Sequence, residues 1–405
     1  MEKIITDEKL VDEVLERGVE QVFPDKKSFR EKLRSGEQIR LYCGYDPSAP
    51  ALHIGNAATL NKLAQFQELG HEVIFLIGDF TGMIGDPTDK AATRKKLTRE
   101  EVLKNAEDYQ KQASGYLKFG GENPAKIMYN SEWSDKLTFK EVIEIASNFT
   151  VGQMVQRDMF QKRMESEKPI YLHEFLYPLA QGYDSVAMDV DAEVGGNDQM
   201  FNMLCGRTLQ RNINNKEKFV LTLKLLADET GKKMGKTEGN AVFLNQTSED
   251  MFGAVMSWTD GIIAIGLEMA TDIPMDEVEK IRKSLKDEKN NPRDFKMKLA
   301  YEIVKINHGE KAAITARENF EKVFSKREVP ETVAEIEATI GASIVATMVL
   351  AEIAESNADA KRKIEQGGVS IDGATVKDFK YSISGSDNGK VLKVGKREFR
   401  KIKVI

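Results

Sequence analysis

Hydrophobic and polar positions in the first half of the chain predict a strand, a helix and a second strand. Residues 38–77 hold a short apolar run (IRLYC), a Gly/Pro loop, helical spacing over 55–69 and a second apolar run, EVIFLI. This order requires a parallel sheet, because a helix must carry the chain back before the next strand begins. The alternation continues with a charged helix over 98–119, a strand over 126–129 and helices between 138 and 164.

The pattern changes twice in the second half. From about 247 to 324, β-like runs disappear and apolar residues recur at helical spacing, which predicts an all-helical domain. Residues 325–342 show no clear core and predict a linker. Two short helices and the runs VSIDG, KVLKV and KIKVI then predict a small α+β module. We expect an α/β chain with four parts: a Rossmann-like parallel-sheet domain with an inserted connective region over 1–240, a helical domain over 241–325, a linker over 326–341 and an α+β domain over 342–405.

Composition narrows the class of protein. The 405 residues are 41% hydrophobic and 31% charged, values typical of a soluble globular chain long enough for two or three domains. The sequence contains no apolar stretch near the roughly 20 residues of a membrane span, and the opening MEKIITDEKL lacks the apolar core of a secretory signal. A cytoplasmic location is expected. Cys43 and Cys205 are the only cysteines, too few for a disulfide framework or a thiolate zinc site, although a single pair stays open.

Charge is distributed unevenly. The net charge is −6, yet residues 341–405 carry 12 Lys and Arg against 8 Asp and Glu, while the rest carries 47 against 57. A basic tail on an acidic body indicates that the small C-terminal module meets a polyanion while the body does something else.

The segment DPSAPALHIGN, residues 46–56, lies between the first strand and its helix, where open parallel sheets bind ligands. A nucleotide is the natural guest. His53 could donate to a phosphate oxygen that gains charge in a transition state, and Gly55 would let a purine approach the helix backbone. The alternative is a surface histidine at a turn and a glycine that merely begins a helix.

The segment GKKMGKTEGN, residues 231–240, combines lysines, glycines and a threonine in an expected loop. It is not a phosphate-binding P-loop, because Gly231 and Gly235 enclose three residues instead of four and an apolar strand does not directly precede it. It can instead close on a polyphosphate, with Lys233 and Lys236 as point charges. The alternative is a solvated basic loop.

Three further segments carry polar chemistry. In FTGMIGDPTDKAATR, residues 80–94, Asp86 lies on a Gly-Asp-Pro turn and could accept from an ammonium group, with basic residues behind it for phosphates. Tyr177, Gln181 and Asp184 share one face of an expected helix, which favours a polar pocket over a solvent-facing stripe. In VGGNDQ, Asp198 could accept from hydroxyls, or the segment is simply a turn.

Together these motifs resemble the class I aminoacyl-tRNA synthetases, whose HIGH and KMSKS signatures correspond to HIGN at 53–56 and KMGKT at 233–237. The segments LYCGYDPSAPALHIGN, GDFTGMIGDP, HEFLYPLAQGYD and GGNDQ look like bacterial-type tyrosyl-tRNA synthetases over essentially the whole chain. SNADAKRKIEQGGVSIDG is similar to the small RNA-binding fold named after a ribosomal protein, which that family carries at its C-terminus. That module explains the basic tail.

The resemblance implies that the chain activates tyrosine with ATP, releases pyrophosphate and transfers the tyrosyl group to the 3′ end of tRNA(Tyr). Tyr42 and Asp184 match the pair that recognises the phenolic hydroxyl, while Asp86, Tyr177 and Gln181 match the group around the ammonium. A substrate without the hydroxyl would leave buried polar groups unpaired, which predicts discrimination against phenylalanine. The implied tyrosine pocket is Tyr42, Thr81, Asp86, Tyr177, Gln181, Asp184 and Gln199.

For the nucleotide, the resemblance implies catalysis by positioning and charge neutralisation, without a covalent intermediate on the enzyme. It implies Mg²⁺ bound through the phosphates of ATP, a homodimer, and a helical domain that binds the anticodon arm. The catalytic set is His53, Asn56, Lys90, Arg94, Lys233, Lys236 and Thr237. The ATP-binding set is Cys43, Asp46, His53, Gly55, Gly196, Asp198 and Lys236.

Two positions depart from the family signatures. Asn56 replaces the second histidine of HIGH, but it can donate to the same kinds of oxygen. Gly235 replaces the first serine of KMSKS, which removes a hydroxyl and loosens the loop while both lysines stay. We expect function to survive both changes.

Three other functions compete with this interpretation. A tryptophanyl-tRNA synthetase would share the fold and nucleotide signatures, but Tyr42, Asp184 and the C-terminal module favour tyrosine. A smaller nucleotidylyltransferase would leave the helical and basic domains unexplained. An RNA-binding factor on a retired catalytic scaffold would be expected to have lost His53 or the loop lysines, and the chain keeps them.

Overall fold

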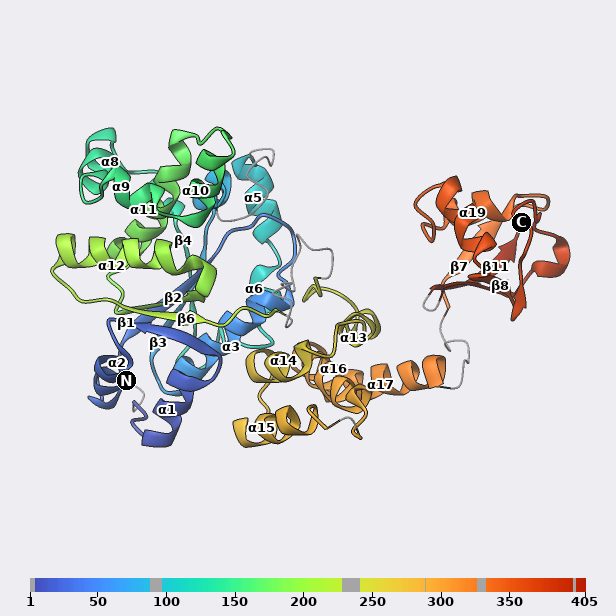
Figure 1. Cartoon of the computed structure of the whole chain (residues 1–405), viewed down its shortest axis with the longest axis horizontal. Helices are drawn as coiled ribbons and strands as arrows, with labels where there is room; N and C mark the ends of the chain where they lie inside the picture. The colour runs from blue at the N-terminus through green and yellow to red at the C-terminus, as the bar shows by residue number, and fades with distance from the viewer. Residues whose placement is uncertain (1–3, 88–96, 228–240, 288, 326–332, 396–397) are drawn as a thin grey trace. The chain divides into compact units, whose positions relative to one another are not determined.

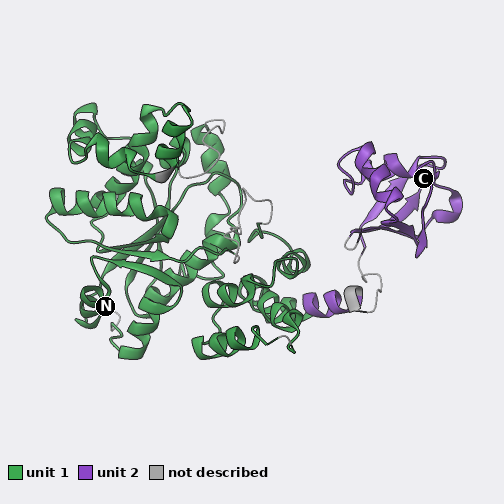
Figure 2. Cartoon of the chain, viewed as in Figure 1, with its two compact units in different colours: residues 1–314 green, residues 315–405 purple. Residues whose placement is uncertain are grey.

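The computed structural model describes residues 4–87, 97–227, 241–287, 289–325, 333–395 and 398–405. These residues form two compact units, 1–314 and 315–405 (Figure 2). The boundary falls inside α17 (Glu310–Ser325), upstream of the expected linker.

A six-stranded sheet forms the centre of the first unit, in the order β1-β6-β5-β2-β3-β4. The five strands from β2 to β6 run parallel and β1 is antiparallel to β6, so the predicted parallel sheet is confirmed. Strand order reverses at β2, because β3 lies on one side of it and β5 on the other. The strands are β1 (Val19–Phe23), β2 (Arg40–Tyr45), β3 (Glu72–Ile77), β4 (Lys126–Tyr129), β5 (Ala192–Gly196) and β6 (Phe219–Leu223).

Helices cover both faces of this sheet, with α3 on one side and the packed pair α11 and α12 on the other (Figure 1). In the part of the chain that the structure describes, none of the helices is both long and apolar enough to cross a membrane. The helices before β6 are α1 (Glu8–Glu16), α2 (Lys26–Arg34), α3 (Ile54–Glu68), α4 (Thr81–Ile84), α5 (Arg99–Ala106), α6 (Tyr109–Ala113), α7 (Ser131–Ser134), α8 (Phe139–Ala146), α9 (Val151–Val155), α10 (Asp158–Glu165), α11 (Leu172–Ala187) and α12 (Met200–Asn214), with a 3₁₀ turn, η1, at Asn197–Gln199.

The single helix predicted over 98–119 was wrong, because the structure has α5 and α6 there. The second helix is held by the loop after β2. Tyr109 donates its hydroxyl to the Ala49 carbonyl at 2.7 Å, and Gln112 accepts from the Leu52 amide at 2.7 Å. These contacts set the direction of α6 by tertiary packing, which helical periodicity alone does not reveal.

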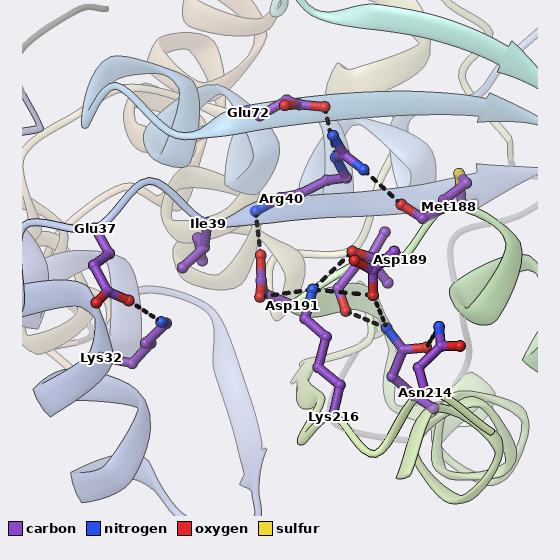
Figure 3. Close-up of polar contacts among 12 residues, drawn as sticks. Lys32, Glu37, Ile39, Arg40, Glu72, Met188, Asp189, Asp191, Asn214 and Lys216 are labelled. Atoms are coloured by element: carbon purple, nitrogen blue, oxygen red, sulfur yellow. Dashed lines mark hydrogen bonds and ion pairs between the residues drawn. The ribbon is translucent and has the colours of Figure 1, made fainter. Parts of the chain in front are cut away.

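A polar clamp joins the amino ends of the central strands (Figure 3). The Arg40 guanidinium donates to Glu72 at 2.7 Å and to the Met188 carbonyl at 2.9 Å, while the Arg40 amide donates to Asp191 at 2.8 Å. Lys216 pairs with Asp191 at 3.0 Å. The clamp keeps β2 in register with its neighbours on both sides.

The predicted helical region is confirmed by α13 (Ser248–Met256), α14 (Ile262–Ala270), α15 (Met275–Ser284), α16 (Pro292–His308) and α17. The buried guanidinium of Arg17, close to the start of β1, fastens α14 to the six-stranded sheet. It donates to the carbonyls of Glu268 and Ile273, both at 2.8 Å, and to that of Thr271 at 2.5 Å. The carbonyls at the end of α14, which have no partner within the helix, therefore accept hydrogen bonds from a residue about 250 positions earlier in the sequence.

The second unit contains a five-stranded sheet in the order β7-β11-β10-β8-β9. The predicted linker is wrong over part of its length, because β7 pairs in parallel with β11 and buries Ile336. A four-residue edge strand has too short a pattern to detect in the sequence. The elements are β7 (Glu335–Ala338), α18 (Ile344–Leu350), α19 (Asn357–Glu365), β8 (Val369–Ile371), β9 (Ala374–Thr375), η3 (Gly385–Asp387), β10 (Val391–Val394) and β11 (Glu398–Val404).

Candidate active site

The polar residues singled out in the sequence gather where β2, β3 and β5 end. Asp46 directly follows β2, Thr81 opens α4 after β3, and Gly196 is the last residue of β5. The carboxyl ends of parallel strands lie at one edge of a sheet, and open sheets of this kind bind ligands where the strand order reverses, which is at β2 in this chain. The polar face of α11 faces this edge through Tyr177, which reaches Asp46.

Asp46 lies at the centre of the first polar group. Its Oδ1 accepts from the Thr81 hydroxyl at 2.6 Å, and its Oδ2 accepts from the Tyr177 hydroxyl at 2.8 Å. A Cβ on Gly78 would lie 2.0 Å from Asp46 Oδ1, so only glycine fits at that position. The structure thus joins three predicted residues and adds Gly78, which the sequence analysis missed.

The surroundings of Asp46 have opposing effects on the pKa of its carboxyl group. The pKa of its carboxyl is raised to about 7, chiefly by burial and in smaller part by the charges of Asp86 and Asp79. The hydrogen bonds from Thr81 and Tyr177 lower it, because both donate to the ionised form. The site therefore has a carboxylate whose charge depends on its donors.

A second polar group lies deeper in the pocket, around Tyr42 and Asp184. Both side chains are buried. Asp184 accepts from the Trp133 indole at 2.8 Å and from the Asn130 amide at 3.3 Å, while the Tyr42 hydroxyl lies 2.9 Å from Ser185 Oγ. Burial raises the pKa of both Tyr42 and Asp184 well above their usual values. Tyr42 and Asp184, the two residues predicted to recognise a phenol, therefore lie in one buried region, and different neighbours hold each of them in place.

A buried ion pair lies below Tyr42. Lys218, just before β6, pairs with Glu193, the second residue of β5, and both are buried. Lys218 also donates to Ser185 Oγ at 2.7 Å, and Glu193 accepts from the Gln181 amide at 3.1 Å. Burial lowers the pKa of Lys218, and the carboxylate of Glu193 opposes that shift. The Gln181 side chain is therefore held by Glu193, a charged residue that the sequence analysis did not identify.

The other end of the pocket contains Asp86 and Gln199. The Gln199 amide donates to Asp86 Oδ2 at 2.7 Å, and the buried Asn202 amide donates to Gln199 Oε1 at 3.0 Å. This arrangement holds one oxygen of the Asp86 carboxylate, and the charge of Asp86 also acts on Arg157. A cationic group is the partner that such a carboxylate favours.

His53 and Asn56 form the start of α3. The His53 amide donates to Asn56 Oδ1 at 3.0 Å, and His53 Nδ1 accepts from the Gly55 amide at 3.1 Å, which completes a capping box. Because Nδ1 accepts, Nε2 of the neutral imidazole carries the hydrogen and can donate to a ligand. Asn56, the departure from the signature, is thus the N3 residue of the capping box whose N-cap is His53.

The structure describes only some of the other residues predicted to bind ATP or its phosphates. Cys43 is buried, and burial raises the pKa of its thiol to about 12, so it stays neutral. A Cβ on Gly196 would lie 2.7 Å from Asp198 Oδ1, so the carboxylate crosses close to the backbone of β5. The segment Val242–Leu244 pairs with the segment that contains His53 through bonds at 2.8 Å. Lys90, Arg94, Lys233, Lys236 and Thr237 lie outside the described residues.

Within the described ranges, the structure contains no cluster of three or more His, Cys, Asp or Glu side chains suited to a metal ion. The described site residues instead include the carboxyl groups of Asp46, Asp86 and Asp184, each of which accepts from hydroxyl, amide or indole donors. This chemistry suits an amino acid that has an ammonium group and a buried hydroxyl. Of the residues that sequence reasoning missed, Asn130 and Trp133 come from the end of β4 and from α7, and no local pattern marked them.

Comparison with known proteins decides the family. Residues 34–325 match the family model described as class I tRNA synthetases (W and Y), and residues 319–402 match the C-terminal domain of tyrosine–tRNA ligases. The chain belongs to the tyrosine–tRNA ligase family of class I tRNA synthetases. A tyrosine–tRNA ligase of Thermotoga maritima is 43% identical over 390 residues, which is 96% of each chain. That of Photobacterium profundum is 43% identical over 96% of this chain and 97% of its own.

Solved structures agree with the family assignment. A C-terminally truncated mitochondrial tyrosyl-tRNA synthetase of Coccidioides posadasii is 26% identical, with a TM-score of 0.63 over 77% of this chain and 92% of its own. A tyrosyl-tRNA synthetase of Archaeoglobus fulgidus, solved with L-tyrosine, has a TM-score of 0.60 at 20% identity, which shows the fold alone. The resemblance inferred from the sequence motifs is confirmed, and the tryptophan alternative is not supported by these relatives.

Proposed function

We propose that the chain activates tyrosine with ATP and then transfers the tyrosyl group to tRNA(Tyr) for protein synthesis. The observation that carries the proposal is that the buried Asp184, the bonded pair Asp86 and Gln199, and Asp46 gather around Tyr177 at the carboxyl ends of the central strands. A phenol and an ammonium group on one small molecule are the partners that such carboxyl groups favour. Membership of the tyrosine–tRNA ligase family supports the same substrates.

In the first step, a carboxylate oxygen of tyrosine bonds to the α-phosphorus of ATP. The bond from that phosphorus to the bridging oxygen breaks, and its electron pair leaves with pyrophosphate. Enzyme groups need only position the reactants and offset charge. His53, whose Nε2 hydrogen is directed by the bond at Nδ1, donates to the phosphate as charge develops.

The phosphates need further positive charge. We assign that role to Lys90, Arg94, Lys233, Lys236 and Thr237, which are predictions from the signatures. Mg²⁺ enters with ATP, bound chiefly through phosphate oxygens, because this ion keeps several waters and rarely needs an all-protein cage. Cys43, Asp46, Gly55, Gly196 and Asp198 line the expected ribose and purine side.

In the second step, a hydroxyl of the terminal tRNA adenosine attacks the carbonyl carbon of the adenylate, loses its proton, and AMP leaves. We propose that residues 1–240 carry out both steps, that 241–325 bind the anticodon arm, and that 342–405 bind RNA. The excess of Lys and Arg in the last segment supports the RNA assignment. The place of action is the cytoplasm, where tRNA and ATP meet.

The experiment that tests this proposal is exchange of labelled pyrophosphate into ATP, with Mg²⁺, each of the twenty amino acids and no tRNA. Exchange with tyrosine alone is the expected result. Exchange with tryptophan would mean that Tyr42 and Asp184 had been misassigned, and exchange with none would favour a retired scaffold that binds RNA. His53→Ala is the matched variant and should slow exchange about 100-fold, the scale of a lost transition-state donor.

We also propose a homodimer. Large apolar side chains are exposed on neighbouring parts of the first unit, including Phe139 at 81%, Val151 at 77% and Leu172 at 78%. Monomers rarely expose contiguous apolar area of this kind. Analytical ultracentrifugation should show a dimer that Phe139→Glu with Leu172→Glu dissociates. Leu350→Glu, at a side chain 82% exposed in the second unit, is the control that should leave the dimer intact.

A further inference from the structure

An asparagine near the start of α12 holds the side chain that binds Asp86. Asn202 is the third residue of α12 and has 0% exposure. Its amide donates to Gln199 Oε1 at 3.0 Å, and the Gln199 amide in turn donates to Asp86 Oδ2 at 2.7 Å. A continuous line of hydrogen bonds therefore runs from the buried side of α12 to Asp86, which follows α4.

The carboxylate of Asp86 fixes the direction of both bonds. An ionised carboxylate only accepts hydrogen bonds, so Gln199 must turn its NH2 group toward Asp86. The Gln199 carbonyl oxygen then points the opposite way, where the Asn202 amide supplies a donor. If the Gln199 amide rotated by half a turn, its oxygen would face an oxygen of Asp86 and the two would repel. The bond from Asn202 therefore favours the one orientation of Gln199 that serves Asp86.

Asn202 is the fixed member of this line. Gln199 and Asp86 are both half-buried, so packing alone does not hold either side chain. Asn202 is fully buried, and a Cβ on Gly195 of β5 would lie only 2.8 Å from Sδ of Met203, the neighbour of Asn202. Because α12 approaches β5 this closely, the backbone that carries Asn202 has little room to move.

A role in stability alone explains Asn202 less well. In the part of the chain that the structure describes, the buried Asn202 Oδ1 has no hydrogen-bond partner. A buried oxygen of this kind costs free energy, and a leucine of similar size would avoid that cost. The NH2 group of Asn202, through its bond to Gln199, gives the polar side chain a specific task.

We propose that Asn202 is a positioning residue for the ammonium end of tyrosine, acting through Gln199 on Asp86. The inference rests on the proposed function, in which Asp86 accepts from the ammonium group. Tyr42 and Asp184, at the phenol end, are held by other neighbours. The effect of Asn202 should therefore be confined to ligands that carry an ammonium group.

The first test compares two analogues of tyrosine on the full chain. Tyramine has the phenol and the ammonium group, whereas 3-(4-hydroxyphenyl)propionate has the phenol and lacks the ammonium group. Each displaces labelled tyrosine in equilibrium dialysis without ATP. Asn202→Leu should weaken tyramine about tenfold, the scale of one hydrogen bond to a charged group, and leave 3-(4-hydroxyphenyl)propionate unchanged. In pyrophosphate exchange, KM for tyrosine should rise by a similar factor, with KM for ATP unchanged.

A double-mutant cycle tests whether Asn202 acts through Gln199. Gln199→Met removes the donor to Asp86 and keeps the length of the side chain. Asn202→Leu added to Gln199→Met should raise KM for tyrosine no further, because the bond that Asn202 supports is already absent. Leu209→Val, on the same helix and also at 0% exposure, is the matched control. It should lower the melting temperature without changing KM for tyrosine or the binding of either analogue.

Equal weakening of the two analogues by Asn202→Leu, unchanged tyramine binding, or additive effects in the cycle would overturn the role of Asn202 while leaving the proposed function in place. Asn202→Ala, which adds no bulk, gives the same comparison if the leucine variant does not fold. Absence of tyrosine exchange by the unmodified chain would instead remove the proposed function and this inference with it.

Discussion

The Tyr177 hydroxyl donates to Asp46 Oδ2 at 2.8 Å, across 131 positions of sequence, and so joins α11 to the loop after β2. The bond stabilises the ionised carboxylate of Asp46, whose pKa burial raises to about 7. The protonation state of Asp46 at neutral pH therefore depends on a donor from α11.

Tyr177→Phe should raise the pKa of Asp46, because a donor to the charged form is lost while burial stays. The acidic limb of kcat/KM for tyrosine should move to higher pH, and activity near pH 7 should fall about tenfold, the scale of a lost bond to a charged group. A pH profile of pyrophosphate exchange measures both effects. Tyr183→Phe, on the same helix, is the control, and a profile for Tyr177→Phe that matches it would contradict the coupling.

Substitutions at Asn56 should separate its contribution to the capping box of α3 from its proposed role near ATP. Asn56→Ala loses the acceptor for the His53 amide, so thermal unfolding should show a loss of about 1 kcal/mol. Asn56→Asp keeps that acceptor and adds a charge that favours a helix start, so stability should be equal or higher. Its KM for ATP should nevertheless rise, because the new charge repels phosphates. Unchanged ATP affinity in Asn56→Asp would place this residue away from the nucleotide.

His71 should make the protein sensitive to acid. The side chain is fully buried, and burial lowers its pKa to about 4 from 6.5. The unfolded chain binds the proton first as pH falls, so stability is lost from about pH 6.5 down to about 4. Between pH 7.5 and 5 this loss amounts to about 2 kcal/mol.

His71→Asn should remove that slope while keeping an acceptor for the Ile39 amide, which donates to His71 Nδ1 at 3.4 Å. Urea unfolding of both proteins at pH 7.5 and 5 measures the difference. Identical pH slopes would show that His71 does not cause the acid sensitivity.

Truncation after Ser325 should spare tyrosine activation and damage transfer to tRNA. The second unit has its own core, and β7 belongs to it through β11, so a cut at 341 would leave Ile336 without its partner strand. Pyrophosphate exchange should stay within about twofold, whereas aminoacylation of tRNA(Tyr) should fall at least tenfold at moderate salt, because phosphate contacts dominate RNA affinity. Equal loss of both activities would contradict the modular division.

The sequence by itself determined the parallel sheet, the helical region and the positions of the main polar motifs. Each depends on local order: apolar runs of strand length, helical spacing, and Tyr177, Gln181 and Asp184 on one helical face. The segments 46–56 and 80–94 could be singled out because each directly follows a predicted strand, and strand ends of a parallel sheet converge.

Only the tertiary structure decided how those residues are supported. Asn130, just after β4, and Trp133 in α7 reach Asp184, and Lys218, just before β6, reaches Ser185. A lone lysine before a strand resembles a surface residue until the strand is placed inside a sheet, here between β1 and β5. Partners of this kind are chosen by the packing of distant segments, because a buried donor must find an acceptor wherever the fold brings one near.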